Sequence, residues 1–399
     1  MNKIELLAPA GSLEKVKWAI DYGADAVFLG GEHFSLRANA SNLKDPEIKK
    51  AVTYAHKRGK LVYVTINIIF HETDFKELKQ YLLKLQTYKV DALIVSDIGV
   101  ISKIKAIIPD MKIHLSTQAS VYNYEAALFY EKLGVKRIVL ARECSKADIK
   151  KIISQTNLEV EVFIHGAMCS GFSGRCILSN ELTKRDANRG GCSQVCRFKF
   201  DLTKNNELVG ADLPFSLNTK DLSMAPYIKE LIELGVTSLK IEGRMRSIYY
   251  IATTCHIYKL IINDYMHQLK DYTYNEKYAS LLNQCSNRHS TPQFYNSDKA
   301  VHASYYDLKN IPSNQDFLAI VLDYNEATKV ATIEQRNNFK VGTKVCAFGP
   351  NTPLTSFVID NLVSVEGVLV DTARHPKEKL MFKTNHKLAK SDIIRIDYS

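Results

Sequence analysis

The sequence has no long apolar run. None of its stretches approaches the roughly 18 to 20 apolar residues that a helix needs to cross a bilayer. The first residues, Met1 to Pro9, carry a charge at Glu5 and end in a proline, so they do not resemble the apolar region of a secretory signal. We therefore expect a protein without a membrane span and with a cytoplasmic location.

Several common catalytic motifs are also missing. The sequence contains no HExxH pair of a zinc peptidase and no GxSxG turn of a serine hydrolase. Glycine-rich phosphate loops of the dinucleotide-binding and P-loop types are absent as well. A peptidase built on this chain would have to use an unfamiliar site.

Cysteine is sparse outside one segment. Four of the eight cysteines, Cys169, Cys176, Cys192 and Cys196, lie within one short stretch. A chain of 399 residues can build its own core, so this crowding does not resemble a secreted disulfide framework and favours metal binding. We interpret the other four as core residues, with the first of them as the candidate exception because it follows an expected strand: Cys144, Cys255, Cys285 and Cys346.

The spacing of the clustered cysteines narrows the kind of metal centre. Six, fifteen and three residues separate them in turn, which is neither the CxxC pair of a zinc ribbon nor the CxxxCxxC of radical enzymes. Thiolates are soft ligands that favour iron–sulfur clusters and zinc. The wide loops fit a 4Fe-4S cluster better than a single zinc ion, and zinc or unligated cysteines remain the alternatives.

Positive charge is in excess. The formal net charge is +10, which suits an RNA partner, although general drift in composition is an equal explanation. Local clustering of the basic residues would distinguish an RNA partner from drift in composition. Basic side chains do gather around the cysteines, with few carboxylates among them. This clustering favours anion binding around the cysteines by the basic residues Arg175, Lys184, Arg185, Arg189, Arg197 and Lys199. We do not expect DNA as a partner.

The fold class follows from a repeated unit of amphipathic helix, glycine or polar turn, and apolar run. In the first unit Ser12 is placed to cap a helix that Gly23 ends. Eight nearly continuous apolar runs are typical of a parallel sheet covered on both faces, which predicts a (β/α)8 TIM-like barrel, with a doubly wound open sheet as the alternative. The runs are 4–7, 26–29, 61–66, 89–95, 112–115, 134–140, 159–164 and 235–241.

Three other regions complete the expected organisation. The barrel spans 1–265 and carries a cysteine-bearing insertion at about 167–213, which has no clear helical or strand period and is long enough to be functional. A polar, Tyr- and Asn-rich connector covers 266–315. Short alternating runs broken by turn residues predict a small antiparallel β-barrel domain over 316–399.

Candidate catalytic residues lie where barrel strands end, because the C-terminal ends of the strands form the active face of such a barrel. His165 could donate a proton, bind a metal or sit in the core. Glu143 and Glu242 are candidate general bases. Arg142 and Arg244, next to them, are either ion-pair partners or binders of phosphate and carboxylate.

The segment from His165 to Ser179, HGAMCSGFSGRCILS, closely resembles the signature of peptidase family U32, the so-called collagenase-like group. Supporting matches lie at 7–11, 37–40, 185–192 and 239–244. The stretch 286–295 follows the family pattern only loosely and lacks its glycine, which puts contacts by that stretch in doubt.

The resemblance implies RNA hydroxylation rather than proteolysis. Members similar to this chain form 5-hydroxyuridine at the wobble position of tRNA, with a 4Fe-4S centre and with prephenate as the implied hydroxyl donor. The implied cluster ligands are the four clustered cysteines. In our hypothesis His165, Glu242 and Arg244, which lie at strand ends, serve proton transfer and anion binding. Candidate substrate-binding residues are Arg142, Arg185, Asn188, Arg189, Asn218 and Lys240.

Two other functions stay open. The first is a collagenase-like peptidase of the same family, whose activity should survive conversion of the clustered cysteines to serine. The second is a zinc-stabilised RNA-binding protein without enzymatic activity. The sequence leaves the oligomeric state undetermined.

Overall fold

The computed structural model describes residues 4–36, 42–209, 215–296 and 316–398. The chain divides into two compact units. The larger comprises 1–279 and 288–311, and the smaller comprises 280–287 and 312–399. In the described residues, no helix is long and apolar enough to cross a membrane.

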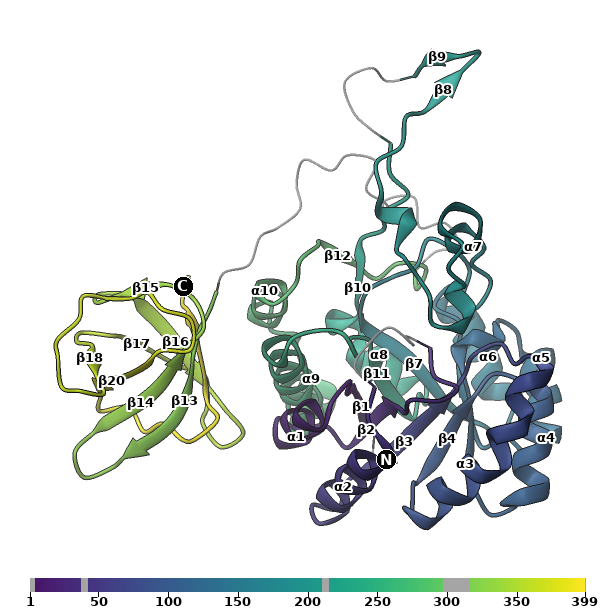
Figure 1. Ribbon diagram of the computed structural model, residues 1–399, viewed down its shortest axis with the longest axis horizontal. Coiled ribbons are helices and arrows are strands. Elements are labelled where there is room, and N and C mark those ends of the chain that lie inside the picture. Colours follow the sequence, from purple (N-terminus) through teal and green to yellow (C-terminus); the bar gives the residue numbers. More distant parts are fainter. Residues whose placement is uncertain (1–3, 37–41, 210–214, 297–315, 399) are drawn as a thin grey trace. The chain divides into compact units, whose positions relative to one another are not determined.

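The larger unit is a closed parallel barrel (Figure 1). Each strand pairs in parallel with its neighbour, and the last strand pairs with both the first and the seventh. This closure confirms the predicted (β/α)8 barrel and rules out the open sheet. The barrel strands are β1 (Glu5–Pro9), β2 (Ala26–Gly30), β3 (Leu61–Ile66), β4 (Ala92–Val95), β5 (Ile113–Leu115), β6 (Arg137–Val139), β7 (Glu159–Gly166) and β11 (Ser238–Ile241).

Amphipathic helices cover the outside of the barrel. The first begins as the sequence predicts, with the Ser12 hydroxyl accepting a hydrogen bond from the Lys15 amide at 3.2 Å, and Gly23 follows it with φ +108°. The helices are α1 (Leu13–Asp21), α2 (Asp45–His56), α3 (Phe75–Thr87), α4 (Ile98–Ile107), α5 (Tyr124–Lys132), α6 (Lys146–Gln155), α8 (Ile228–Glu233) and α9 (Ile248–Gln268).

A charged network fills the barrel at the ends where the strands begin. Arg137, the first residue of β6, pairs with Glu5 at 2.5 Å and with Glu161 at 3.2 Å. Lys240 reaches the other oxygen of Glu161 at 2.7 Å, and Tyr63 donates to Glu5 at 2.6 Å. The interior also contains a buried apolar cluster that includes Leu7, Phe28 and Ile94.

The cysteine-bearing insertion leaves the barrel after β7. Its described part contains α7 (Leu178–Thr183) and a small hairpin of β8 (Thr203–Lys204) and β9 (Glu207–Leu208), which projects away from the barrel in Figure 1. β10 (Asp221–Ser223) then runs antiparallel to the end of β7. The insertion is thus attached to the rim formed by the strand ends.

The stretch expected to be a connector contains regular structure. Helix α9 continues to Gln268, and α10 (Lys277–Gln284) follows. β12 (Ser290–Thr291) then pairs in parallel with β10 and so joins the barrel sheet.

The smaller unit is an antiparallel β domain, as predicted. Its core contains apolar side chains from most of the strands, including Leu318, Ile333 and Phe382. A two-stranded ladder accompanies the main sheet. The sheet order is β17 (Thr355–Val358), β16 (Lys344–Phe348), β21 (Ile393–Ile396), β13 (Phe317–Asn325), β14 (Val330–Gln335), β20 (Lys379–Lys383) and β18 (Val363–Ser364), and the ladder joins β15 (Phe339–Lys340) to β19 (Thr372–Ala373).

Candidate functional site: two adjoining cavities at the barrel mouth

A cavity of about 100 Å³ opens where the barrel strands end, and we call it the mouth cavity. Its charged lining residues are Arg142, Lys240, Glu242 and Arg244. Neutral hydrogen-bonding side chains complete much of the wall: Thr65, Asn67, Ser116, Thr117 and Gln118. Three cations and one carboxylate thus face a polar space large enough for several water molecules or a small organic molecule.

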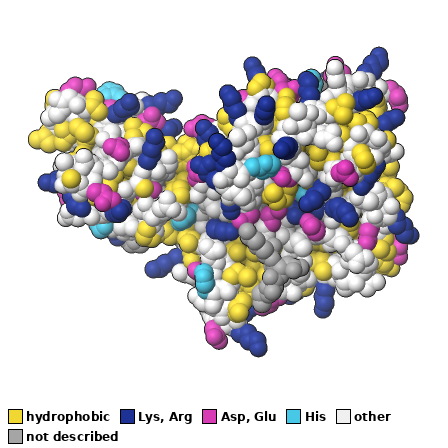
Figure 2. All heavy atoms as spheres, turned by 90° about the horizontal axis from the view of Figure 1, so that it is seen from below, with side chains coloured by type: hydrophobic (Ala, Val, Ile, Leu, Met, Phe, Trp, Pro, Cys, Tyr) yellow, Lys and Arg dark blue, Asp and Glu magenta, His cyan; other side chains and the backbone are white. Residues whose placement is uncertain are grey.

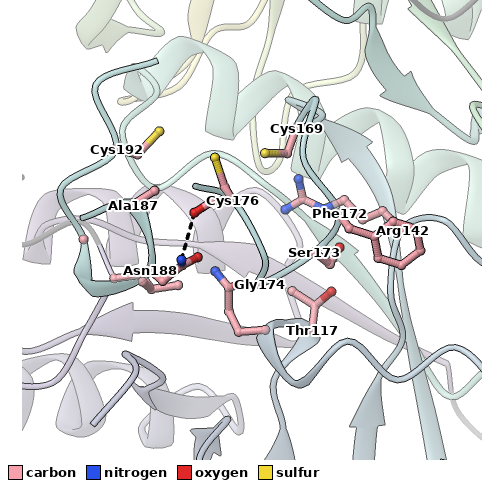
Figure 3. A pocket seen from close by; sticks show the side chains of 13 residues that line it. Thr117, Arg142, Cys169, Phe172, Ser173, Gly174, Cys176, Ala187, Asn188 and Cys192 are labelled. Carbon is pink, nitrogen blue, oxygen red and sulfur yellow. Dashed lines mark hydrogen bonds between the residues drawn. The ribbon is translucent and has the colours of Figure 1, made fainter. Parts of the chain in front are cut away.

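A second cavity, of about 170 Å³, lies beside the first under the insertion, and we call it the cysteine hollow. Cys169, Cys176 and Cys192 line it, and Figure 3 shows their sulfur atoms directed toward a common space. The two cavities share four lining residues: Leu36, Thr117, Gln118 and Arg142. The site therefore has two adjoining compartments.

The structure brings all four clustered cysteines into one neighbourhood. All are free thiols, and each of Cys169 and Cys196 lies close enough to other members for their charges to interact. Desolvation raises the pKa of the Cys169 and Cys196 thiols, while the Arg142 and Arg197 guanidiniums respectively oppose that shift. Within the described part of the chain, no three His, Cys, Asp or Glu side chains are arranged to hold a metal ion.

Local contacts fix the insertion over the barrel. Gly174 has φ +79° and sits where a Cβ atom would collide with the Gln118 carbonyl, so glycine permits the close approach. The Ser173 amide and hydroxyl both donate to the Glu143 carboxylate, at 3.1 and 3.0 Å. Glu143 is buried and is not among the lining residues of either cavity, so its observed contact is an anchor for the cysteine loop.

Arg142 separates the two compartments. Its guanidinium donates to the Ala167 carbonyl at 2.7 Å and lies 4.1 Å from the centre of the Phe163 ring. The distance to the Glu242 carboxylate is 3.6 Å, which is an ion pair without a close hydrogen bond. Arg142 is therefore placed to bind an anion in either compartment.

Glu242 and Arg244 both line the mouth cavity, as their strand-end position predicts. Arg244 is buried, donates to Ser35 at 2.8 Å and also donates to the Leu36 carbonyl. The hydroxyl of Tyr250 donates to the Glu242 backbone carbonyl at 3.0 Å and holds this turn in place. Lys240, deeper in the barrel, contacts both the cavity and the charged network beneath it.

His165 lies in the wall of the barrel behind the site. It is buried between the rings of Tyr250 and Tyr258, and its Nδ1 is 3.2 Å from the Tyr258 hydroxyl. That hydroxyl donates to the Ile164 carbonyl, so Nδ1 is the donor to the Tyr258 oxygen. Burial lowers the pKa of His165 to about 3, with a smaller contribution from Arg246, which keeps the imidazole neutral.

The sequence-predicted residues of the insertion have different surroundings. Asn188 lines the cysteine hollow and donates to the Cys176 carbonyl at 2.9 Å (dashed line in Figure 3). Arg189 forms a two-pronged pair with Asp74, at 2.7 and 3.1 Å, and so attaches the insertion to the barrel. Arg185 is exposed on the insertion. The family-like segment 37–40 lies outside the described residues.

Asn218 belongs to a buried cluster of charged groups beyond the hollow. It accepts a hydrogen bond from Arg288 at 3.2 Å. Arg288 and Arg246 both pair with Asp221, the latter at 3.1 Å, and Arg197 is close enough for its charge to interact with Asp221. Burial raises the pKa of Asp221 although the three guanidiniums oppose it. The guanidiniums thus outnumber the carboxylate in this cluster.

Sequence reasoning missed part of the lining. Asn67, Thr117 and Gln118 line the mouth cavity but are not among the site residues predicted from the sequence. Position after a strand was the available signal for them. Leu36, which lines both cavities, carried no such signal because it lies in an irregular loop after β2.

Comparison with known families agrees with the site. The model of "Peptidase family U32" matches residues 11–304, and that of the "Peptidase family U32 C-terminal domain" matches 313–395. The chain belongs to peptidase family U32. The cysteine signature, the barrel mouth and the insertion all fall within the first match.

Individual relatives carry names of different kinds. The "tRNA hydroxylation protein P1" of Bacillus subtilis (strain 168) is 40% identical over 400 residues, which cover 99% of this chain and 95% of the relative. The "23S rRNA 5-hydroxycytidine C2501 synthase" of Escherichia coli (strain K12) is 38% identical and matches 66% of this chain and 40% of its own length. A "Collagenase" of Porphyromonas gingivalis is 32% identical, over 66% of this chain and 67% of its own length.

Proposed function

We propose that this U32 chain is a tRNA hydroxylase that converts the wobble uridine to 5-hydroxyuridine. The observation that carries the proposal is the 40% identity, over nearly the whole of both chains, to a protein named for tRNA hydroxylation. The rRNA 5-hydroxycytidine synthase supports the same chemistry, because it too is named for a hydroxylated pyrimidine. A tRNA substrate supports a cytoplasmic location, which we propose as well.

We propose a 4Fe-4S cluster for the four clustered thiols, because the chemistry of this set of ligands suits one. Cys169, Cys176 and Cys192 line the hollow beside the barrel mouth, and Cys196 lies close enough to Cys176 and Cys192 for their charges to interact. Four thiolates are the usual ligand set of such a cluster. We therefore assign Cys169, Cys176, Cys192 and Cys196 as the residues that would hold it. When bound, the cluster supplies electron transfer or activation of a substrate at the hollow. Zinc is the alternative occupant.

The reaction needs an oxygen donor, for which we propose prephenate. Overall, uridine C5–H becomes C5–OH, a two-electron oxidation, while the C–OH of the donor becomes C–H, the matching two-electron reduction. The protein's part is to position both molecules and to move protons. Glu242, the carboxylate in the lining of the mouth cavity, is our candidate for proton transfer, and Arg142 and Arg244 are our candidates for binding negative charge.

The RNA contact is best sought on the barrel unit. Residues 316–398 contain eleven Lys and Arg against ten Asp and Glu, so almost all of the net charge of +10 belongs to the remainder of the chain. Figure 2 shows one face on which Lys and Arg are spread among acidic and apolar side chains. An anticodon loop already presents unstacked bases, so the enzyme need not open a duplex.

Nucleoside mass spectrometry tests the function. We expect tRNA from a strain lacking this chain to lose 5-hydroxyuridine, and the full chain to restore it when expressed from a plasmid. The matched control is Cys346→Ser in the β domain, which should restore it as well, whereas Cys176→Ser should not. An unchanged nucleoside profile in the deletion strain would overturn the proposal, and peptide cleavage that survives Cys176→Ser would favour a peptidase.

A further inference from the structure

The mouth cavity has a composition that the family name does not explain. A peptide-binding cleft would be open and mixed, whereas this space is small and has Arg142, Lys240 and Arg244 in its wall against the single carboxylate Glu242. Phe28, Ile94 and Phe163 provide flat or apolar wall between the charged groups. A concave site where charged and polar groups converge among a few apolar side chains can orient a small polar molecule.

We infer that the mouth cavity is a binding site for a small organic acid, separate from the cysteine hollow, and that Arg142 joins the two by exchanging Glu242 for the ligand carboxylate. The cavity of about 100 Å³ has room for a small molecule. This inference rests on the proposed function and deepens it, because it assigns the hydroxyl donor a binding site beside the cysteine hollow.

The contacts of Arg142 make the exchange reasonable. Its donation to the Ala167 carbonyl at 2.7 Å and its packing on Phe163 hold the guanidinium in place whether or not Glu242 is paired. The 3.6 Å separation from Glu242 leaves the carboxylate pair loose. A ligand carboxylate could therefore form a close two-pronged hydrogen bond with this guanidinium, as arginine does well.

The other cations of the wall act from fixed positions. Arg244 is held by Ser35 and the Leu36 carbonyl, and Lys240 is held by Glu161 at 2.7 Å. They lend positive potential to the cavity without having to move. Thr117 and Gln118, which line both compartments, offer hydrogen bonds to hydroxyl groups of a ligand.

The decisive experiment is isothermal titration calorimetry on the purified full chain without RNA. The probes are prephenate, which has two carboxylates, phenylpyruvate, which has one, and neutral benzyl alcohol. We expect binding in the order of carboxylate number and none of the alcohol. Arg142→Gln should weaken prephenate binding by about tenfold or more, because a hydrogen-bonded charge partner is removed.

Glu242→Gln gives the result that a structural role cannot imitate. It removes the competing carboxylate and should tighten prephenate binding several-fold, whereas a misfolded protein could only bind more weakly. Arg374→Gln in the β domain is the matched control, because the Arg374 side chain is 62% exposed and is not among the lining residues of either cavity. Its affinity should equal that of the wild type.

The outcomes separate this inference from the proposed function. Acid binding with the expected response of both variants, in a protein whose deletion leaves tRNA nucleosides unchanged, would keep the site and remove the RNA substrate. Formation of 5-hydroxyuridine by a chain that binds neither acid, or whose Glu242→Gln and Arg142→Gln variants bind as the wild type does, would overturn the site and keep the function.

Discussion

The two ends of the barrel hold charges in different ways. At the ends where strands begin, Glu161 is fully buried and paired with both Arg137 and Lys240. At the mouth, Arg142 and Glu242 are 3.6 Å apart and both line a cavity. Charged groups that are closely paired and buried cannot bind a ligand. A pair that is further apart beside a cavity leaves a charged group that a ligand can bind. The base of the barrel thus serves stability, and the mouth serves chemistry.

Removing one thiol should have the largest effect on this comparison. We expect Cys176→Ser to abolish iron–sulfur incorporation, and with it tRNA hydroxylation, while the free energy of unfolding of the metal-free chain barely changes. The reason is that Cys176 lies at the rim rather than in the core. Iron content and the blue-violet absorbance of anaerobically purified protein measure the result. A Cys176→Ser protein that keeps its full iron content would remove the assignment of the ligands.

A substitution at the base should do the reverse. We expect Glu161→Gln to lower the free energy of unfolding by about 3 to 5 kcal/mol, because it leaves two buried cations short of their partner. Glu159→Gln is the matched control, since Glu159 pairs with the same Arg137 but its side chain is 51% exposed, and we expect a loss below about 1 kcal/mol. Urea denaturation measures both. Equal losses for the two variants would show that the base is not specially constrained.

Buried histidines should make the stability of the barrel depend on pH. Burial lowers the pKa of His114 and of His165 to about 3, from an ordinary value of 6.5. Below pH 6.5 the two histidines bind protons in the unfolded chain but not in the folded chain. Their contribution to the free energy of unfolding is therefore fully present above that pH and is lost as the pH falls toward 3. The expected slope is about 1.4 kcal/mol per pH unit for each histidine.

Variants can assign this slope to each histidine. His165→Asn should remove about half of the two-histidine contribution between pH 6 and 4.5. Urea denaturation at a series of pH values measures it. If the free energy of unfolding of His165→Asn depends on pH as steeply as that of the wild type, His165 is protonated in the folded state. It would then again be a candidate proton donor.

The smallest predicted effect concerns the joint between barrel and insertion. Glu143→Gln should cost about 1 to 2 kcal/mol, because Ser173 loses one of two hydrogen bonds to a buried carboxylate. Ser173→Ala and the double variant complete a cycle that isolates the contact. Additive losses, together with unchanged proteolysis of the insertion, would contradict an anchoring role for Glu143.

The sequence predicted the barrel well because its signal is local. Nearly continuous apolar runs located all eight strands, and Ser12 with Gly23 marked the ends of the first helix. The insertion could be recognised only by its lack of periodicity. Its attachment to the barrel, through Ser173 and Arg189, depends on partners far away in the sequence and gave no local pattern.

The candidate site was predicted unevenly for the same reason. Their position at the ends of strands predicted Arg142, Glu242 and Arg244 as site residues, and all three line the mouth cavity. It also brought out Glu143, one residue further along, whose side chain instead meets Ser173. A one-residue step at the end of a strand decides which way a side chain points, and sequence reasoning does not resolve that step.

By itself, the sequence determined the eight-stranded barrel, the β domain after it and the crowding of four cysteines in one insertion, since periodicity and spacing are properties of the chain. Only the tertiary structure decided that three of these thiols line a hollow sharing Arg142 with the barrel mouth, and that His165 is held neutral behind it. Burial and proximity arise when distant segments pack together, so they set ionisation and pairing in ways that no local pattern records.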